Sequence, residues 1–282
     1  MLINSGASVA LTNVVVTGNM TIGGSGNGGG IYSEGTLTMT GGSVTSNSAS
    51  GGYGGGLSLW GPATLTDVDV SSNTGSSVGG ILINSSSSSF TLDRVLISDN
   101  QGASGNTNTG GLWVNAGPTT LTNVTLSGNR SSSGTANLKA GASTTLTNVT
   151  IYNSAADATY SMFGTSANIT MVNTLLANAG GGTNCSAAVT SLGYNLSSDN
   201  SSCSGSTPTG VQFSATLLTY LGPLANNGGN TKTHALLSTS PAIDAGSNAY
   251  CRATDQRGVA RPIDGDGISI AVCDIGAYEY GS

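Results

Sequence analysis

Charge is the property that this 282-residue sequence has least of. Charged residues make up 7% of it, whereas an average globular domain carries about 25%. Seven lysines and arginines and a net charge of −6 offer too few contacts to hold a phosphate backbone. We therefore expect no nucleic-acid partner.

Long apolar runs are also missing. No stretch approaches the ~18 apolar residues of a membrane-spanning helix, so we expect no membrane insertion. Met1 is followed by strand-like sequence without the basic segment of a signal peptide. Met1–Gly6 aligns best with the middle of a repeat, Leu112–Gly117. We therefore expect the chain to begin inside a longer protein, without its export signal and its anchor.

Cysteine is scarce, and all four copies lie in the last hundred residues. An even number of cysteines in a chain rich in Ser, Thr and Asn indicates disulfides and an oxidising compartment. Their spacings lack the close pairs of a zinc site. Of the possible pairings we expect Cys185–Cys203 and Cys251–Cys273, because each closes a local loop.

A ten-residue motif, TLTNVTLSGN at 120–129, recurs with drift along the chain. Its second position is occupied in turn by Leu11, Leu37, Leu65, Leu92, Leu121, Leu146 and Met171, in steps of 26, 28, 27, 29, 25 and 25 residues. A near-constant period in the twenties indicates a solenoid. Within the motif apolar and polar residues alternate, which is typical of a half-buried strand.

A second apolar strand precedes most motifs, often after a glycine pair such as Gly55-Gly56. Glycine pairs suit the tight corners between strands. The segments between the strands are too short for crossover helices. The sequence therefore predicts an all-β fold: a right-handed parallel β-helix of about seven rungs over residues 1–183, closed by a disulfide-bearing C-terminal region at 184–282.

One motif position is asparagine on five successive rungs. Stacking places equivalent residues of adjacent rungs ~4.8 Å apart. We therefore predict a ladder of amides that bond from rung to rung, in a turn where Asn tolerates a left-handed backbone. Its members are Asn19, Asn47, Asn73, Asn100 and Asn129.

Asp67 and Asp69 lie two apart on one outward strand face, and Arg94 falls above Asp67 in the next rung. Paired carboxylates serve glycoside hydrolysis. The alternative, which we favour, is a salt bridge between Asp67 and Arg94 with Asp69 solvated. The three residues are the catalytic candidates if the protein is an enzyme.

Aromatic residues gather on another face. If Ile31, Leu57, Ile81 and Leu112 point inward, the outward column holds Tyr32, Ser58, Leu82, Trp113 and Lys139, with Trp60 at the following corner. Exposed aromatic rings in a polar setting suit sugar stacking. Tyr32, Trp60, Trp113 and Lys139 are therefore the candidate ligand-binding residues. The alternative is ordinary strand propensity.

Two further columns are rich in threonine and form a Thr-x-Thr array that resembles the faces of ice-binding solenoids. The first column consists of Thr36, Thr64, Thr91, Thr120, Thr145 and Thr170. The second column lies two residues further along each strand, and Asp93 interrupts it. Threonine is also simply a good outward strand residue.

The C-terminal region carries specific motifs: Leu221–Gly246, Asp255-Gln256-Arg257-Gly258, Arg261-Pro262 and Cys273–Glu279. Across about residues 184–280 it resembles the choice-of-anchor Q domain of bacterial surface proteins. In that family the domain follows right-handed parallel β-helix repeats related to pectin-lyase-like and polymorphic outer-membrane-protein folds. The resemblance implies export and a secreted or cell-surface location. It implies no catalytic residues.

The same region contains Asp264-Gly-Asp266-Gly, which resembles part of a calcium loop, with Asp274 nearby. These three residues are the metal candidates; the alternative is an Asp-Gly turn. His234, the single histidine, is expected to be structural. Asp244, Arg257 and Arg261 are expected to form buried hydrogen bonds that close the coil.

We therefore expect an exported, surface-associated, non-enzymatic protein, adhesin-like or structural, that contacts polysaccharides or cell-surface glycans. We expect no cofactor, with calcium as the one candidate. The first alternative is a polysaccharide lyase or glycoside hydrolase. The second is ice binding through the threonine columns. The sequence leaves the oligomeric state open.

Overall fold

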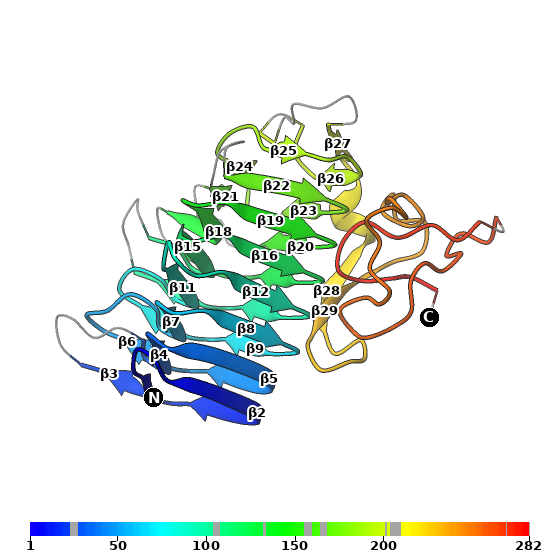
Figure 1. The fold of residues 1–282 in the computed structure, drawn as a ribbon. Helices are drawn as coiled ribbons and strands as arrows, with labels where there is room; N and C mark the ends of the chain where they lie inside the picture. Colours follow the sequence, from blue (N-terminus) through cyan, green and yellow to red (C-terminus); the bar gives the residue numbers. More distant parts are fainter. Residues whose placement is uncertain are drawn as a thin grey trace.

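The computed structural model describes residues 1–22, 28–103, 108–131, 134–154, 160–163, 168–200, 202–203, 210–268 and 270–281. The chain winds into a parallel β-solenoid whose rungs stack from the N-terminus upward (Figure 1). The prediction of an all-β parallel β-helix is confirmed.

The first face of the solenoid is an eight-stranded parallel sheet. Its strands come from the short apolar segments that precede each motif. In order they are β1 (Leu2–Ile3), β4 (Ile31–Ser33), β7 (Leu57–Leu59), β11 (Ile81–Asn84), β15 (Leu112–Ala116), β18 (Thr135–Ala140), β21 (Tyr160–Phe163) and β24 (Thr183–Cys185).

The motif itself supplies two faces. In the lowest rungs the long strands β2 (Ser8–Thr17) and β5 (Thr36–Thr45) run through the corner between them. Above, the second face consists of β8 (Ala63–Thr66), β12 (Phe90–Asp93), β16 (Thr119–Thr122), β19 (Thr144–Thr147), β22 (Ile169–Val172) and β25 (Thr190–Ser191). The third consists of β9 (Asp69–Ser71), β13 (Leu96–Ser98), β17 (Thr125–Ser127), β20 (Thr150–Asn153), β23 (Leu175–Asn178), β26 (Asn195–Ser197) and β27 (Val211–Phe213).

A small parallel sheet follows the third face in the lower rungs. It contains β3 (Met20–Thr21), β6 (Ser48–Ala49), β10 (Thr74–Gly75) and β14 (Gln101–Gly102). Glycine is required at this corner: a Cβ on Gly55 would lie 2.4 Å from the carbonyl oxygens of Gly79 and Thr74. Close approach of the backbones therefore explains the recurrent glycine pairs.

The core consists of stacked apolar columns. Leu65, Leu92 and Leu121 face one another in register and have no exposed surface. In the rung below, the structure corrects the alignment: Met39, not Leu37, pairs with Leu65, and Thr38, not Thr36, pairs with Thr64. The two extra residues lengthen the start of β5, so the motif of this rung begins at Thr38.

The asparagine ladder is present in the structure. In each of the four steps an Nδ2 atom donates to the Oδ1 atom of the next Asn at 2.9 or 3.0 Å, from Asn19 through Asn47, Asn73 and Asn100 to Asn129. The left-handed residue lies one position earlier than predicted, at Gly18, Ser46, Ser72, Asp99 and Gly128. The Asn side chain points inward because its neighbour, not the Asn itself, turns the chain.

The repeats were expected to end at residue 183, but the parallel coil continues beyond it. There β24, β25, β26 and β27 pair in parallel with the strands of the preceding rungs. The chain then forms a 3-10 helix, η1 (Leu217–Tyr220), and an antiparallel hairpin of β28 (Leu221–Ala225) and β29 (Thr233–Leu236). We call residues 214–281 the strap.

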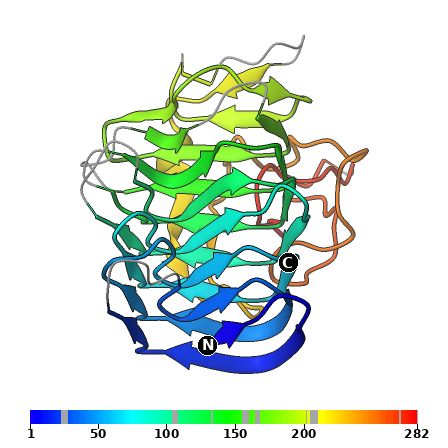
Figure 2. The same cartoon turned by 60° about the vertical axis from the view of Figure 1, so that its left-hand side comes forward.

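The strap lies along the third face of the coil, and both views show it beside the rungs (Figures 1 and 2). It was expected to close the end of the coil, but its hydrogen bonds reach rungs from Arg94 up to Asn173. The outward residues of the third face are apolar or hydroxylated there, and a second core forms beneath the strap around Leu175, Leu196, Leu217, Leu236 and Ile275.

Both predicted disulfides, Cys185–Cys203 and Cys251–Cys273, are present. Disulfides persist in oxidising compartments, so the two bridges indicate an extracellular environment. Among the described residues there is no helix with the length and apolarity to cross a membrane.

We expect Asn73→Ala to lower the free energy of unfolding by on the order of 2–4 kcal/mol, because the buried N–H of Asn47 loses its acceptor and the Asn47 Nδ2 and Asn100 Oδ1 atoms each lose one partner. Thr64→Ala, on an exposed strand position, is the matched control and should change stability by less than about 0.5 kcal/mol. Denaturant unfolding measures both. Equal losses in the two variants would contradict a stabilising ladder.

Candidate functional site

The corner between the second and third faces carries a column of residues in the left-handed conformation. It contains Asp67, Arg94, Asn123, Asn148 and Asn173, with φ between 49° and 57°. In the upper rungs this is the Asn of the TLTN motif, and its side chain holds the strap. Asn123 Nδ2 donates to the carbonyl of Thr254 at 3.0 Å, and Asn173 exchanges two hydrogen bonds with the backbone of Ser247.

Sequence reasoning missed this role, although a partial signal was present. The fourth motif position is Asn in the rungs under the strap and Asp67 or Arg94 in the two rungs below them. Asn13 holds the same position in the first rung, so the residue type alone does not mark where the strap docks.

Asp67 and Asp69, the two carboxylates among the catalytic candidates, do not act as a pair, because Arg94 binds Asp67. Arg94 binds Asp67 through two hydrogen bonds of 2.9 Å and also contacts Asp93 at 2.6 Å. The favoured alternative, a cross-rung salt bridge, is therefore what the structure contains. Asp69 is half-buried rather than solvated, and burial raises its pKa. Its Oδ1 atom has no hydrogen-bond partner among the described residues.

Beside this salt bridge lies the arginine groove, a depression of ≈ 450 Å³ between the second face and the strap. Asp93 and Arg94 line one side, and Arg252 of the strap lines the other. Burial, and then the nearby Asp67 carboxylate, raise the pKa of Asp93, whereas Arg94 opposes the shift. The structure thus brings together the Asp93 carboxylate and the guanidinium groups of Arg94 and Arg252. Of the two arginines, only Arg94 was a candidate from the sequence.

Tyr32, Trp113 and Lys139 lie on the first face, as predicted, in the register Tyr32–Ser58–Leu82–Trp113–Lys139, and Trp60 directly follows β7. Tyr32 meets Trp60 edge to face with ring centres 6.5 Å apart. The Lys139 ammonium lies 4.2 Å from the centre of the Trp113 ring, a cation–π contact. Burial lowers the pKa of Lys139.

Trp60 and Trp113 line a hollow that we call the aromatic groove. Its volume is ≈ 270 Å³, and its other walls are Tyr53, Leu82, Asn84 and Asn115. Tyr32 and Lys139 do not line it; each contacts one of the two tryptophans. Tyr53, Asn84 and Asn115 were not selected from the sequence, because nothing in the repeat distinguishes them from other corner residues.

The threonine columns share the second face but are not uniformly open. Thr64 and Thr91 are exposed, whereas Thr122 is only 6% exposed, and Arg252 of the strap contacts its hydroxyl. Asp93 interrupts the second column as expected. The wide uncovered face that ice binding requires is therefore interrupted where the strap begins.

The three candidate metal ligands do not all lie together in the structure. Asp264 and Asp266 meet Asp244, with carboxylate oxygens within 4.8 Å of one another, whereas Asp274 is not in this group. The Asp244 Oδ2 atom accepts the N–H groups of Gly265 and Asp266 at 2.9 and 2.8 Å. Asp264 accepts the N–H of Gly267. The bond of Asp264 is typical of an Asp-Gly turn, whereas those of Asp244 join two distant segments. Calcium binding stays a prediction.

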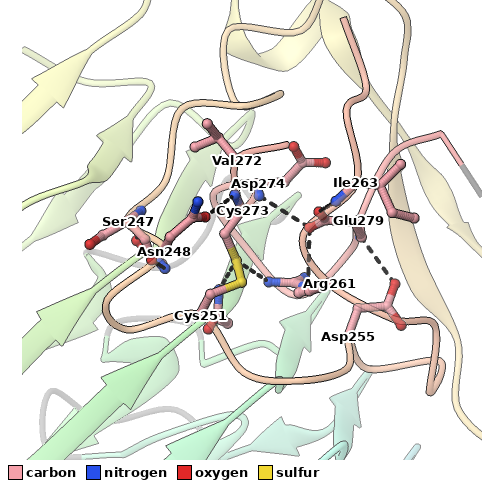
Figure 3. Close-up of a disulfide and its surroundings, with 12 residues drawn as sticks. Ser247, Asn248, Cys251, Asp255, Arg261, Ile263, Val272, Cys273, Asp274 and Glu279 are labelled. Carbon is pink, nitrogen blue, oxygen red and sulfur yellow. Dashed lines mark hydrogen bonds and ion pairs between the residues drawn. A yellow bond between two sulfur atoms is a disulfide. The ribbon is translucent and has the colours of Figure 1, made fainter. Parts of the chain in front are cut away.

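Asp274 instead belongs to a buried charged network around the Cys251–Cys273 disulfide (Figure 3). Its carboxylate accepts the N–H groups of Asp244 and Tyr280 at 2.7 and 2.6 Å. Burial, and then the nearby Glu279 carboxylate, raise the pKa of Asp274 to about 7. Burial also raises the pKa of Glu279.

Arginines hold the rest of this network. Arg261 is buried, pairs with Glu279 at 3.3 Å and donates to the carbonyl of Gly276 at 2.9 Å. Arg257 pairs with the buried Asp255 at 2.7 Å. The expected buried hydrogen bonds of Arg257 and Arg261 are therefore present, but they shape the strap rather than the end of the coil.

His234 joins the strap to the third face, as a structural histidine. Its Nδ1 atom lies 2.7 Å from the carbonyl of Gly222, which can only accept, so Nδ1 carries the proton. Nε2 then accepts the hydroxyl of Ser127 at 2.8 Å. Burial lowers the pKa of His234, and the backbone hydrogen bond opposes this shift.

No protein-family model matches the chain, and no curated protein and no solved structure is significantly similar to it. The resemblance to the choice-of-anchor Q domain therefore stays a prediction.

The raised pKa of Asp274 predicts a pH-dependent stability. A raised pKa stabilises the folded state at low pH, and this stability is lost as the pH rises through about 7. Between about pH 4 and about pH 8, we expect the free energy of unfolding of wild type to fall by a few kcal/mol relative to that of Asp274→Asn. Denaturant unfolding of the two oxidised proteins across this range measures it.

His234 acts in the opposite direction, because its stabilising effect is lost as the pH falls below the ordinary histidine pKa of 6.5. It is the same in both proteins, so its effect cancels in their difference. A stability difference that does not change with pH would contradict the raised pKa of Asp274.

Proposed function

We propose that this is an exported, surface-associated protein that binds glycans through the aromatic groove and is not an enzyme. The β-solenoid with two disulfides is compatible with a secreted surface protein. The observation that carries glycan binding is the pair of tryptophans, held by neighbours on both sides and lining one hollow on the uncovered first face.

Physical chemistry favours sugars over other ligands for such a surface. Tryptophan rings offer an apolar face to the C–H groups of a sugar, while nearby amides serve its hydroxyls. Trp60 Nε1 donates to Ser58 at 3.1 Å, which holds its ring in place. The groove is therefore already shaped in the free protein, which lowers the entropic cost of binding.

We expect Trp113→Ala to weaken glycan binding by on the order of tenfold or more, because one stacking surface is lost. A glycan array followed by titration calorimetry with the best ligand measures the change. Thr64→Ala, on the second face, is the control and should bind as wild type does. Binding that Trp60→Ala and Trp113→Ala both leave unchanged would contradict the groove as the site.

A polysaccharide lyase or hydrolase is the second candidate, and the arginine groove is the observation that favours it. There the raised pKa of Asp93 and the two guanidinium groups resemble an acid–base site. Assays for new reducing ends and unsaturated products, run on the same polysaccharides, separate the two functions. Turnover that Asp93→Asn abolishes would overturn the non-enzymatic proposal.

A further inference from the structure

A β-bulge shapes one end of the aromatic groove. Strand β15 pairs with β11 in simple register up to Val114, opposite Ile83, but Asn84 then pairs with Ala116. Asn115 is therefore one extra residue in β15. Bulges redirect side chains, and here Asn115 Nδ2 donates to Asn84 Oδ1 at 2.8 Å at the groove wall.

The amide pair leaves one acceptor atom and one donor atom that take no part in the bond between the two side chains. A primary amide has one oxygen and two N–H hydrogens. After the bond between them, Asn115 still offers its whole Oδ1 and Asn84 its whole Nδ2, and neither of these atoms makes a side-chain hydrogen bond to the described residues. Turning both amides over leaves the same two kinds of group, one on each amide.

The charge of the groove restricts the ligand. All six lining residues are uncharged. Two charged side chains on the same face are engaged with other residues: Lys139 contacts Trp113, and Glu34 accepts a 2.7 Å hydrogen bond from the Tyr32 hydroxyl. An ionised ligand would lose its hydration without gaining a partner. The groove therefore favours a neutral ligand.

The free donor and acceptor atoms of the bonded amides restrict it further. Two neighbouring hydroxyls of a sugar ring offer one acceptor and one donor on the same edge. A single trans amide, as in an N-acetyl group, presents N–H and C=O on opposite edges and satisfies only one of the two. At ≈ 270 Å³ the groove is slightly smaller than the ~300–1,000 Å³ of typical small-molecule sites, so it suits a single ring.

We propose that Asn84 and Asn115 make the aromatic groove selective for the vicinal diol of a neutral sugar ring, whose apolar face lies on Trp60 or Trp113. This inference rests on the proposed glycan binding and adds the class of sugar to it. Asn84 and Asn115 are the specificity-determining residues, whereas the tryptophans supply affinity.

The test uses the whole chain and neutral tetrasaccharides of glucose, mannose and galactose, with a hexuronate tetrasaccharide and a Gly/Ser peptide as comparison ligands. The tightest neutral sugar is then compared by titration calorimetry with analogues that lack one hydroxyl of a vicinal pair. We expect wild type to prefer the intact sugar to at least one such analogue by about tenfold or more.

Asn115→Leu should bring this ratio close to one while leaving binding that Trp113→Ala still weakens. Asn115 is exposed, so the variant should fold, and Asn4→Leu at another exposed position is its matched control. A wild-type ratio near one, or tighter binding of the hexuronate or the peptide, would overturn the diol inference alone. Failure of wild type to bind any sugar would overturn glycan binding together with it.

Discussion

Each buried asparagine in the middle of the ladder joins three rungs. Asn73, for example, donates to the Asn100 side chain of the next rung and to the carbonyl of Val44 in the previous one. Its own Oδ1 atom accepts both the backbone and the side chain of Asn47. Within the ladder, a rung is therefore fully hydrogen-bonded only between two rungs that also carry Asn at this position, which favours the near-constant period of these rungs.

Periodic features were predictable from the sequence, because stacking converts a repeat into columns. The parallel coil, the ladder residues, the Asp67–Arg94 contact and the register of the aromatic column all follow from the spacing. The misplaced register of β5 has the same origin: an insertion of two residues fits before or within the motif, and only the pairing of Met39 with Leu65 decides between them.

The position of the strap could not be read in this way. Its contacts join residues more than a hundred positions apart, such as Thr125 with Gln256, and Gln256 belongs to no repeat whose spacing could place it. Arg252 enters the arginine groove for the same reason, and Asp244 replaces Asp274 in the acidic group. Likewise the bulge at Asn115 depends on one extra residue in a strand, which the drift of the repeat conceals.

The three long faces consequently differ in what they offer. The strap covers much of the third face, Arg252 restricts the second at Thr122, and the first carries the aromatic groove. Low charge suits this arrangement, since the coil is held by backbone and amide hydrogen bonds. Several of the charges instead lie buried in the strap, where they organise irregular backbone around Arg261 and Asp255.

The strap also bears on how the molecule responds to force. In a simple solenoid each rung contacts only its neighbours, so a pull along the axis peels rungs off one at a time. Here a single segment is fastened from the rung of Arg94 to the rung of Asn173 and is closed by its own disulfide. The strap holds those rungs together, so they should unfold in one step, whereas the rungs below Arg94 can unfold one at a time. The lower rungs are thus the compliant part of the coil, and the rungs under the strap are the stiff part.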